Sequence, residues 1–160
     1  MLAKVVEYLR SNGIPFRLES YPSPEPLPPV AHRLGRAMAV DTWILVIDGR
    51  LSLACVPSGE KMDLFGLRAN LGAEMVTEAT IDDMPQGFGE AGLPAPPLGR
   101  LFGLPLFVDA SVANAEVICF AAFAPTDFVE VTYDDFARIE RPRVADFIRA
   151  GELPESLFER

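Results

Sequence analysis

The sequence is short of the residues from which most metal sites and many catalytic sites are built. It contains one histidine, His32, together with two cysteines and two lysines in 160 residues. A zinc site needs several closely spaced Cys or His ligands, so we expect no metal site and no bound cofactor. There is also no GxxxxGK[ST], HExxH or GxSxG motif, and no GxGxxG follows a strand-like segment. His32 is better explained as a surface helix residue than as a catalytic base.

Long apolar runs are missing as well. None reaches the roughly 18 residues that a membrane-spanning helix requires. The N-terminal segment MLAKVVEYLRSNG is amphipathic and lacks the apolar stretch and small-residue cleavage site of a signal peptide. We therefore expect a cytoplasmic protein with no membrane partner.

Positive charge is scarce, because the formal net charge is −9. An acidic protein is repelled by phosphate backbones unless its basic residues are concentrated in one patch. Two groups of arginines could form such a patch, although ordinary solvated surface is the commoner explanation: Arg33 with Arg36, and Arg138 with Arg141 and Arg143.

The hydrophobic content of 49% is that of a folded chain. At this length we expect one domain over residues 1–150, followed by a frayed tail over 151–160. Cys55 and Cys119 both lie in apolar, strand-like stretches. They are therefore predicted to be buried, reduced core thiols and not a disulfide.

Hydrophobic periodicity and turn residues predict alternating helices and strands. Helices are expected over residues 2–11, 30–36 and 64–71, from Thr132, and from Pro142, with one turn at 80–83. Strands are expected over 16–19, 42–48, 51–57, 74–78, 104–109, 117–123 and 128–132. Residues 21–29 contain five prolines and are predicted to be extended.

Several local signals refine these elements. Asp48-Gly49 predicts a hairpin turn between the second and third strands. Asp63 and Thr132 are predicted to cap the helices that follow them. In the last helix, the apolar face is expected to contain Val144, Phe147 and Ile148. The interleaved pattern favours a single α/β or α+β domain around a mixed sheet.

The segment from Gly92 to Asp109, GLPAPPLGRLFGLPLFVD, joins a Gly/Pro-rich loop to an apolar strand. Glycine lets a backbone approach a ligand closely, and proline stiffens the chain. Such a loop suits a binding rim, because functional residues are often placed on loops of a rigid scaffold. A proline-rich surface crossover explains this stretch alone slightly better.

Four segments, taken in order, together resemble the YbaK/ProX family of aminoacyl-tRNA deacylases, free-standing relatives of the prolyl-tRNA synthetase editing domain. SNGIPFRLE is similar to the opening unit of that family. The stretch from VAHRLGR to RANLG is similar to its short helix, hairpin and "LDL" helix. GEAGLPAPPLGRLFGLPLFVD resembles its Gly/Pro loop, and ICFAAFAPTDFVEVTYDDFARI its closing hairpin and helix. The resemblance covers about residues 1–148 and implies a mixed, partly closed sheet surrounded by helices.

The resemblance also implies an activity and a set of site residues. Family members hydrolyse the ester between a wrong amino acid and the 3′ end of a tRNA. Backbone N–H groups of the Gly/Pro loop, here around Gly92, would polarise the ester carbonyl. The attacking water can be organised by the substrate's own hydroxyl, so no histidine base is required. The positions implied to line the substrate pocket, between hairpin and loop, are Thr42, Leu93, Pro96, Pro97, Gly99, Phe123 and Pro125.

The sequence departs from the family pattern at three places. Asp41 occupies the position of the family lysine, and a carboxylate there repels phosphate. Phe123-Ala124-Pro125 replaces a Gly-Thr-His. The loop is one residue longer and has Leu98 where the family has an aromatic residue. Asp109 matches a retained aspartate that is expected to fix a turn, while Lys61 matches a basic position other than the catalytic lysine.

Three hypotheses follow from this pattern. The first is a trans-acting aminoacyl-tRNA deacylase in which Asp41 is non-functional and another cation, Arg33, Arg36 or Arg100, holds the terminal nucleotide. The second is a catalytically inactive binding module for a small ligand or a protein partner. The third is hydrolysis of a small ester or amide unrelated to tRNA. For the deacylase we expect weak tRNA binding and a monomeric or homodimeric protein.

Overall fold

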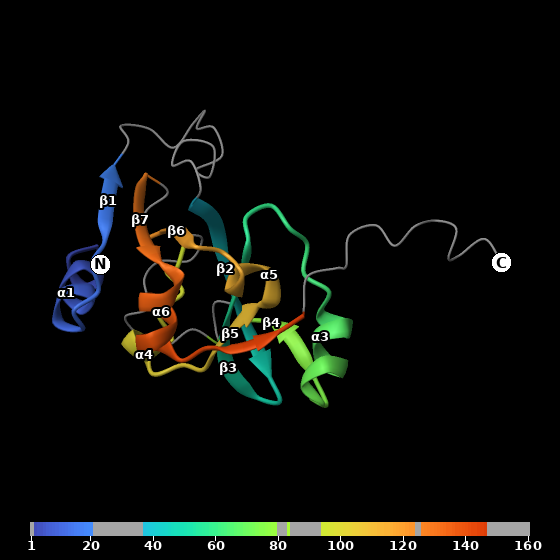
Figure 1. Cartoon of the computed structure of the whole chain (residues 1–160). Coiled ribbons are helices and arrows are strands. Elements are labelled where there is room, and N and C mark those ends of the chain that lie inside the picture. Colours follow the sequence, from blue (N-terminus) through green and yellow to red (C-terminus); the bar gives the residue numbers. More distant parts are fainter. Residues whose placement is uncertain (1, 21–36, 80–82, 84–93, 124–125, 147–160) are drawn as a thin grey trace, which may run out of the picture.

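The computed structural model describes residues 2–20, 37–79, 83, 94–123 and 126–146. An eight-stranded mixed sheet runs through it in the order β1-β7-β6-β2-β3-β5-β8, with β4 beside β2 (Figure 1). The strands are β1 (Arg17–Ser20), β2 (Ala37–Ile47), β3 (Arg50–Pro57), β4 (Val76–Glu78), β5 (Leu106–Asp109), β6 (Val117–Ala121), β7 (Asp127–Thr132) and β8 (Arg143–Ala145). The expectations for residues 21–36, for 80–82 and for the tail at 151–160 fall outside the described residues.

Strand β2 joins the two halves of the sheet. Residues 37–39 pair in parallel with β6, and residues 40–47 pair antiparallel with β3. The predicted hairpin turn is confirmed, since Asp48 and Gly49 both have positive φ, at 49° and 82°. Positive φ at both central residues is the type I′ geometry that matches the twist of the flanking strands.

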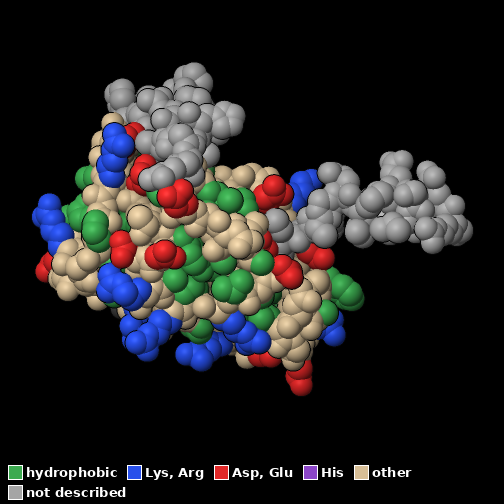
Figure 2. All heavy atoms as spheres, viewed as in Figure 1, with side chains coloured by type: hydrophobic (Ala, Val, Ile, Leu, Met, Phe, Trp, Pro, Cys, Tyr) green, Lys and Arg blue, Asp and Glu red, His purple; other side chains and the backbone are tan. Residues whose placement is uncertain are grey.

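Helices lie on both faces of the sheet. They are α1 (Leu2–Ser11), α3 (Leu64–Leu71), α4 (Gly99–Phe102), α5 (Ala110–Ala113) and α6 (Tyr133–Glu140). The first, second and last of these were predicted from the sequence, but α4 and α5, with four residues each, were not. In the view of Figure 2, Lys and Arg side chains gather along the lower edge, near α4, α6 and β8.

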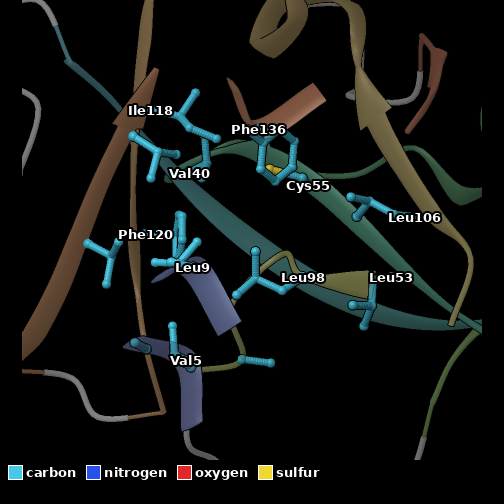
Figure 3. Close-up of a cluster of buried hydrophobic side chains, with 14 of the residues drawn as sticks. Val5, Leu9, Val40, Leu53, Cys55, Leu98, Leu106, Ile118, Phe120 and Phe136 are labelled. Atoms are coloured by element: carbon cyan, nitrogen blue, oxygen red, sulfur yellow. The ribbon is translucent and has the colours of Figure 1, made fainter. Parts of the chain in front are cut away.

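Two hydrophobic clusters on opposite faces of the sheet hold these layers together. The larger contains Val5 and Leu9 of α1, Phe136 of α6 and inward residues of β2 and β3 (Figure 3). The smaller contains Leu45, Ala54 and Val56 against Leu67 of α3. Because side chains alternate along a strand, neighbouring residues of β2 and β3 serve different clusters.

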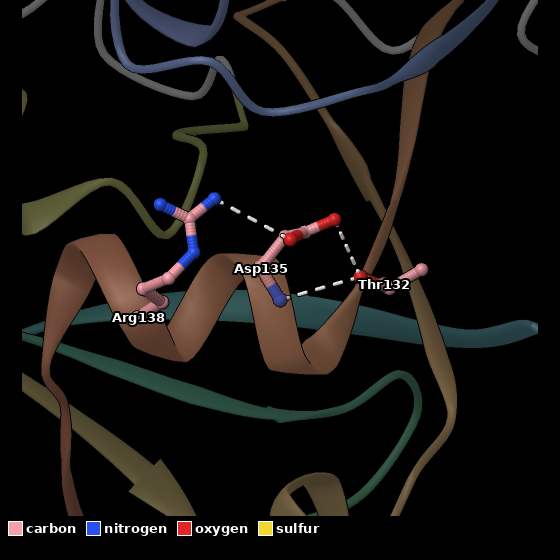
Figure 4. Close-up of polar contacts among 3 residues, drawn as sticks. All are labelled: Thr132, Asp135 and Arg138. Atoms are coloured by element: carbon pink, nitrogen blue, oxygen red, sulfur yellow. Dashed lines mark hydrogen bonds and ion pairs between the residues drawn. The ribbon is translucent and has the colours of Figure 1, made fainter.

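The predicted helix caps are confirmed. Thr132 Oγ1 accepts a hydrogen bond from the Asp135 backbone N at 3.2 Å and donates to Asp135 Oδ2 at 2.9 Å (Figure 4). An Arg138 guanidinium nitrogen lies 3.4 Å from the other Asp135 oxygen. At α3, the Asp63 carboxylate accepts from the Gly66 N at 2.9 Å. Each cap satisfies an N–H that has no partner within its helix.

The helix predicted from Pro142 is wrong. Residues Arg143–Ala145 instead form β8, which pairs in parallel with β5. Arg141 ends α6 with φ at 47°, and the proline after it disfavours a return to helix. Val144 is 50% exposed and does not contribute to a buried helical face. Pairing with β5 therefore determines the structure of this segment, although its apolar residues have helical spacing. Phe147 and Ile148 lie outside the described residues.

Candidate functional site

The second half of the Gly/Pro loop, residues 94–99, is inserted into the protein and does not lie on its surface. Ala95 and Leu98 are 7% and 0% exposed and belong to the large cluster. Pro96, Pro97 and Gly99 are buried as well. Leu98 N donates to the Pro96 carbonyl at 2.8 Å, which tightens the turn. This part of the loop is therefore held by core packing, while Gly92 and Leu93 lie outside the described residues.

Gly99 lies where the end of the Gly/Pro loop packs closely against the start of β5. A Cβ at this position would lie 2.5 Å from the Leu104 carbonyl oxygen and 3.1 Å from Leu106 Cβ. The Gly99 carbonyl accepts from Leu104 N at 2.9 Å, so the two segments are also bonded. The glycine is thus required by the packing of the loop onto the start of β5.

Few backbone donors are available in this half of the loop. Proline has no N–H, so only Ala95, Leu98 and Gly99 carry one in residues 94–99. The Leu98 N–H is already bonded to Pro96. Any oxyanion contact from residues 94–99 would therefore come from Ala95 or Gly99.

Asp41 and Thr42 project from opposite faces of β2, as neighbouring strand residues must. The Asp41 carboxylate accepts from Ser58 Oγ at 3.0 Å and from Gly59 N at 3.3 Å. It therefore ties down the turn after β3. Thr42 lies opposite Cys55, on the face of the large cluster, and its hydroxyl is buried without a hydrogen-bond partner. A ligand hydroxyl or amine beside the Thr42 hydroxyl would find a partner there.

Phe123 lies against the same loop in an unusual backbone conformation. Its φ is 61°, and its N donates to the Pro94 carbonyl at 2.7 Å. The ring is 5% exposed and meets Phe102 edge-on, with centroids 5.5 Å apart. A large side chain at positive φ costs about 1–3 kcal/mol, so the surrounding packing must hold it. Pro125, its predicted partner in the pocket, lies outside the described residues.

The two thiols are buried and free, as predicted. Burial, reinforced by the charges of Asp41 and Asp109, raises the pKa of Cys55 far above its ordinary value. Burial, followed by the charges of Glu130 and Glu19, raises the pKa of Cys119 to about 12. The thiolate is the nucleophilic form, so neither residue can supply a nucleophile near neutral pH.

Asp109 has the structural role expected of it. Its side chain is 2% exposed and accepts from the Ser111 N at 2.9 Å, which caps α5. The Ser111 hydroxyl donates to the same oxygen. Asp109 therefore fixes the turn at the end of β5.

The buried carboxylate of Glu140 holds the end of the Gly/Pro loop in place, and it was not predicted from the sequence. Glu140 is 5% exposed; it accepts from Tyr8 Oη at 2.5 Å and from Arg100 N at 3.1 Å. Arg100 follows Gly99 directly, so Glu140 links α1, α6 and the end of the loop. A signal was present: Glu140 stands four residues after Phe136, on the apolar face of α6.

This anchor predicts a pH dependence of stability. Burial raises the pKa of Glu140 above its ordinary 4.5, although the bonds from Tyr8 and Arg100 oppose that rise. The folded state therefore holds the proton more tightly than the unfolded state. The resulting stabilisation is present below the unfolded-state pKa and is lost as pH rises through the raised one.

Glu140→Gln cannot ionise. Its free energy of unfolding relative to wild type should therefore increase as pH rises from about 4.5 and level off above the raised pKa. Urea unfolding followed by circular dichroism from about pH 4 to about pH 8 measures this difference. A difference that stays constant over the range would mean that Glu140 does not titrate in the folded protein.

Two further features concern the whole of the described chain. None of its helices is long and apolar enough to cross a membrane. Nor do the described residues contain a group of three or more His, Cys, Asp or Glu placed to hold a metal ion.

Comparison with solved structures supports the predicted fold. The hypothetical protein APE2540 is 19% identical with a TM-score of 0.73, over 91% of this chain and 99% of that one. A candidate trans-editing enzyme for prolyl-tRNA synthetase is 18% identical with a TM-score of 0.69, over 91% and 95%. A candidate signal transduction protein from Marinobacter aquaeolei VT8 is 19% identical with a TM-score of 0.71, over 91% of this chain. This chain spans only 30% of the Marinobacter protein.

Sequence comparison identifies the family. No curated protein matches the chain. Residues 31–139 match the aminoacyl-tRNA editing domain, which covers more than half of the sequence and includes the hairpin, the Gly/Pro loop and most of α6. The mixed sheet with surrounding helices agrees with the fold of the candidate trans-editing enzyme. The chain therefore belongs to the aminoacyl-tRNA editing domain family.

Proposed function

We propose that this protein hydrolyses the ester bond of mischarged aminoacyl-tRNA, acting in trans. The observation that carries the proposal is the family match over residues 31–139, which includes a Gly/Pro loop whose described half is fixed in the core. A preorganised loop is what stabilisation of a developing oxyanion requires.

The proposed reaction needs little from the side chains of this protein. Water attacks the ester carbonyl carbon, and backbone N–H groups around Gly92 stabilise the oxyanion. The ester C–O bond then breaks, and the 3′ oxygen of the tRNA takes a proton. The substrate's own hydroxyl orients the water. Thr42, Leu93, Phe123 and Pro125 are proposed to shape the amino acid pocket.

A deacylation panel tests the proposal directly. The purified protein is incubated with tRNAs charged with radiolabelled alanine, cysteine or serine, and loss of label is compared with the spontaneous rate. We expect faster loss for at least one of them. A family member that keeps the lysine provides the positive control. A flat panel beside an active control would contradict the proposed function.

Changing Asp41 to lysine tests whether the nucleotide site persists. Replacing a repulsive charge by an attractive one near phosphate is worth about 1 kcal/mol or more per charge at short range, so tRNA affinity should rise roughly tenfold. Filter binding at fixed salt measures the change. Asp41→Asn is the matched control, because it removes the charge and weakens the contacts with Ser58 and Gly59 without adding a cation. If Asp41→Lys and Asp41→Asn bound tRNA with equal affinity, position 41 would not lie at the nucleotide site.

A second candidate function is a non-catalytic binding module on the same fold. It is favoured by the buried Phe123 ring, which fills space beside the loop, and by the prolines at 94, 96 and 97, which remove backbone donors. This candidate predicts a flat deacylation panel, together with no tRNA affinity at physiological salt.

A further inference from the structure

Three helices are joined by polar contacts at the end of the Gly/Pro loop. The Glu140 carboxylate, at the end of α6, accepts from Tyr8 Oη of α1 at 2.5 Å and from the Arg100 N of α4 at 3.1 Å. Arg100 Nη1 donates in turn to the Ile139 carbonyl at 3.0 Å. Figure 1 shows α1, α4 and α6 together at one end of the molecule.

Glu140 supplies a contact that α4 lacks locally. This helix begins directly after the loop, and its N-cap residue, Leu98, makes no side-chain hydrogen bond. The Arg100 N–H is one of the first amides of the helix, which have no partner within it. Glu140, 40 positions away, accepts from this amide in place of a local cap. Losing the contact would therefore release the first turn of α4, and with it Gly99 at the end of the loop.

The position of α4 also affects the other end of the described loop. Phe102 of α4 meets the Phe123 ring edge-on, with 5.5 Å between the centroids. Phe123 N donates to the Pro94 carbonyl at 2.7 Å. Residues 94–99 are thus held at one end through Arg100 and at the other through Phe123, and α4 contacts both supports.

Stability alone does not account for a carboxylate at position 140. Glu140 is 5% exposed, and a buried charge is often no more stabilising than an apolar side chain of similar volume. An unbranched apolar residue would fill the same place on the apolar face of α6. The carboxylate adds direction, because a hydrogen bond fixes the distance and angle of its partners and an apolar contact does not.

We propose that Tyr8 and Glu140 are positioning residues for the hydrolysis, and that they hold the Gly/Pro loop where its backbone donors meet the ester. The inference rests on the proposed function, in which N–H groups of the loop stabilise the oxyanion. Neither residue lies within the family match over residues 31–139. Helix α1 therefore takes part in the reaction through Tyr8, although the whole helix lies outside that match.

Two replacements of similar size separate the hydrogen bonds of Glu140 from its packing. In Glu140→Gln, the amide oxygen can accept from the Arg100 N and the amide nitrogen can donate to Tyr8 Oη. Glu140→Met fills a similar volume without an oxygen acceptor. We expect Glu140→Met to lower kcat for charged tRNA by about tenfold or more with little change in KM, because a displaced donor is missed mainly in the transition state. Glu140→Gln should keep most of the wild-type kcat.

Tyr8→Phe tests whether Tyr8 acts through Glu140. Alone, it should lower kcat by less than Glu140→Met does, since the bond between Glu140 and the Arg100 N remains. Added to Glu140→Met, it should lower kcat no further, whereas independent residues have additive effects. A further loss in the double variant would overturn the role given to Tyr8.

Leu67→Ala controls for a general loss of stability. Leu67 is fully buried in the small cluster, on the face of the sheet opposite to the loop, so its truncation weakens the core without changing the loop supports. Its kcat should stay near that of wild type at a temperature where circular dichroism shows every variant to be folded. The inference is overturned if Glu140→Met matches Glu140→Gln in kcat, or loses no more than Leu67→Ala.

Hydrogen exchange at the Arg100 amide is a readout that does not depend on activity. This exchange should be faster in Glu140→Met than in Glu140→Gln. Equal exchange in the two variants would overturn the inference even for an active deacylase. A wild-type protein that hydrolyses no charged tRNA would instead overturn the proposed function, and with it the role in the reaction; the deacylation panel shows this before any variant is compared.

Discussion

Replacing Leu98 with alanine should lower the free energy of unfolding by about 2–5 kcal/mol, the range found for leucine removal from packed cores. Leu98 is fully buried in the large cluster, between residues of β2, β3 and α1. The cavity cannot collapse easily, because the neighbouring prolines stiffen the loop. Urea unfolding gives the value, and an unchanged m-value would show that the transition remains comparable with wild type.

Leu18→Ala removes the same atoms at an exposed position and is the matched control. Leu18 is 41% exposed on the edge strand β1, so its loss should cost about 0.5 kcal/mol. We therefore expect Leu98→Ala to lower the free energy of unfolding much more than Leu18→Ala does. Similar losses for Leu98→Ala and Leu18→Ala would mean that the loop is not seated in the core.

Gly99→Ala should destabilise the protein by about 1–3 kcal/mol, because the added methyl overlaps a backbone carbonyl that cannot rotate away. Its Cβ would lie 2.5 Å from the Leu104 oxygen, so the loop and the start of β5 must separate. We also expect faster hydrogen exchange at the Leu104 amide, since that amide donates to Gly99 O. If the proposed function holds, deacylation should fall with the displaced loop.

Gly103→Ala distinguishes crowding from backbone strain. Gly103 ends α4 with φ at 68° and has open space around its Cβ position. Alanine there should cost about 1 kcal/mol through strain alone. It should leave the Leu104–Gly99 bond in place. If the Leu104 amide lost the same protection from hydrogen exchange in Gly99→Ala and in Gly103→Ala, the steric explanation for Gly99 would be wrong.

The sequence signals that succeeded were local. The caps at Asp63 and Thr132 and the turn at Asp48-Gly49 depend on residues within a few positions of one another. β8 could not be predicted from local signals, because it is formed by pairing with β5, which is distant in the sequence. The short helix α4 has no side-chain cap, so it lacked a signal that would have revealed it.

The Gly/Pro loop could be singled out from the sequence, but the contacts that hold it in place could not. The Gly/Pro loop stood out by composition, and the family match includes it. By contrast, the Tyr8–Glu140 bond joins residues 132 positions apart. The contact of Asp41 with Ser58 and Gly59 likewise depends on strand register, which sequence patterns specify only in part.

The change of partner along β2 has a consequence for how the protein moves. Because one continuous strand is bonded to β6 before residue 40 and to β3 after it, neither half of the sheet can open without straining the other. Asp41 and Thr42 lie just past that junction. A ligand bound at Asp41 and Thr42 would therefore stabilise both halves of the sheet against local opening. Its binding would slow amide hydrogen exchange in β6 and β7 as well as in β3 and β5.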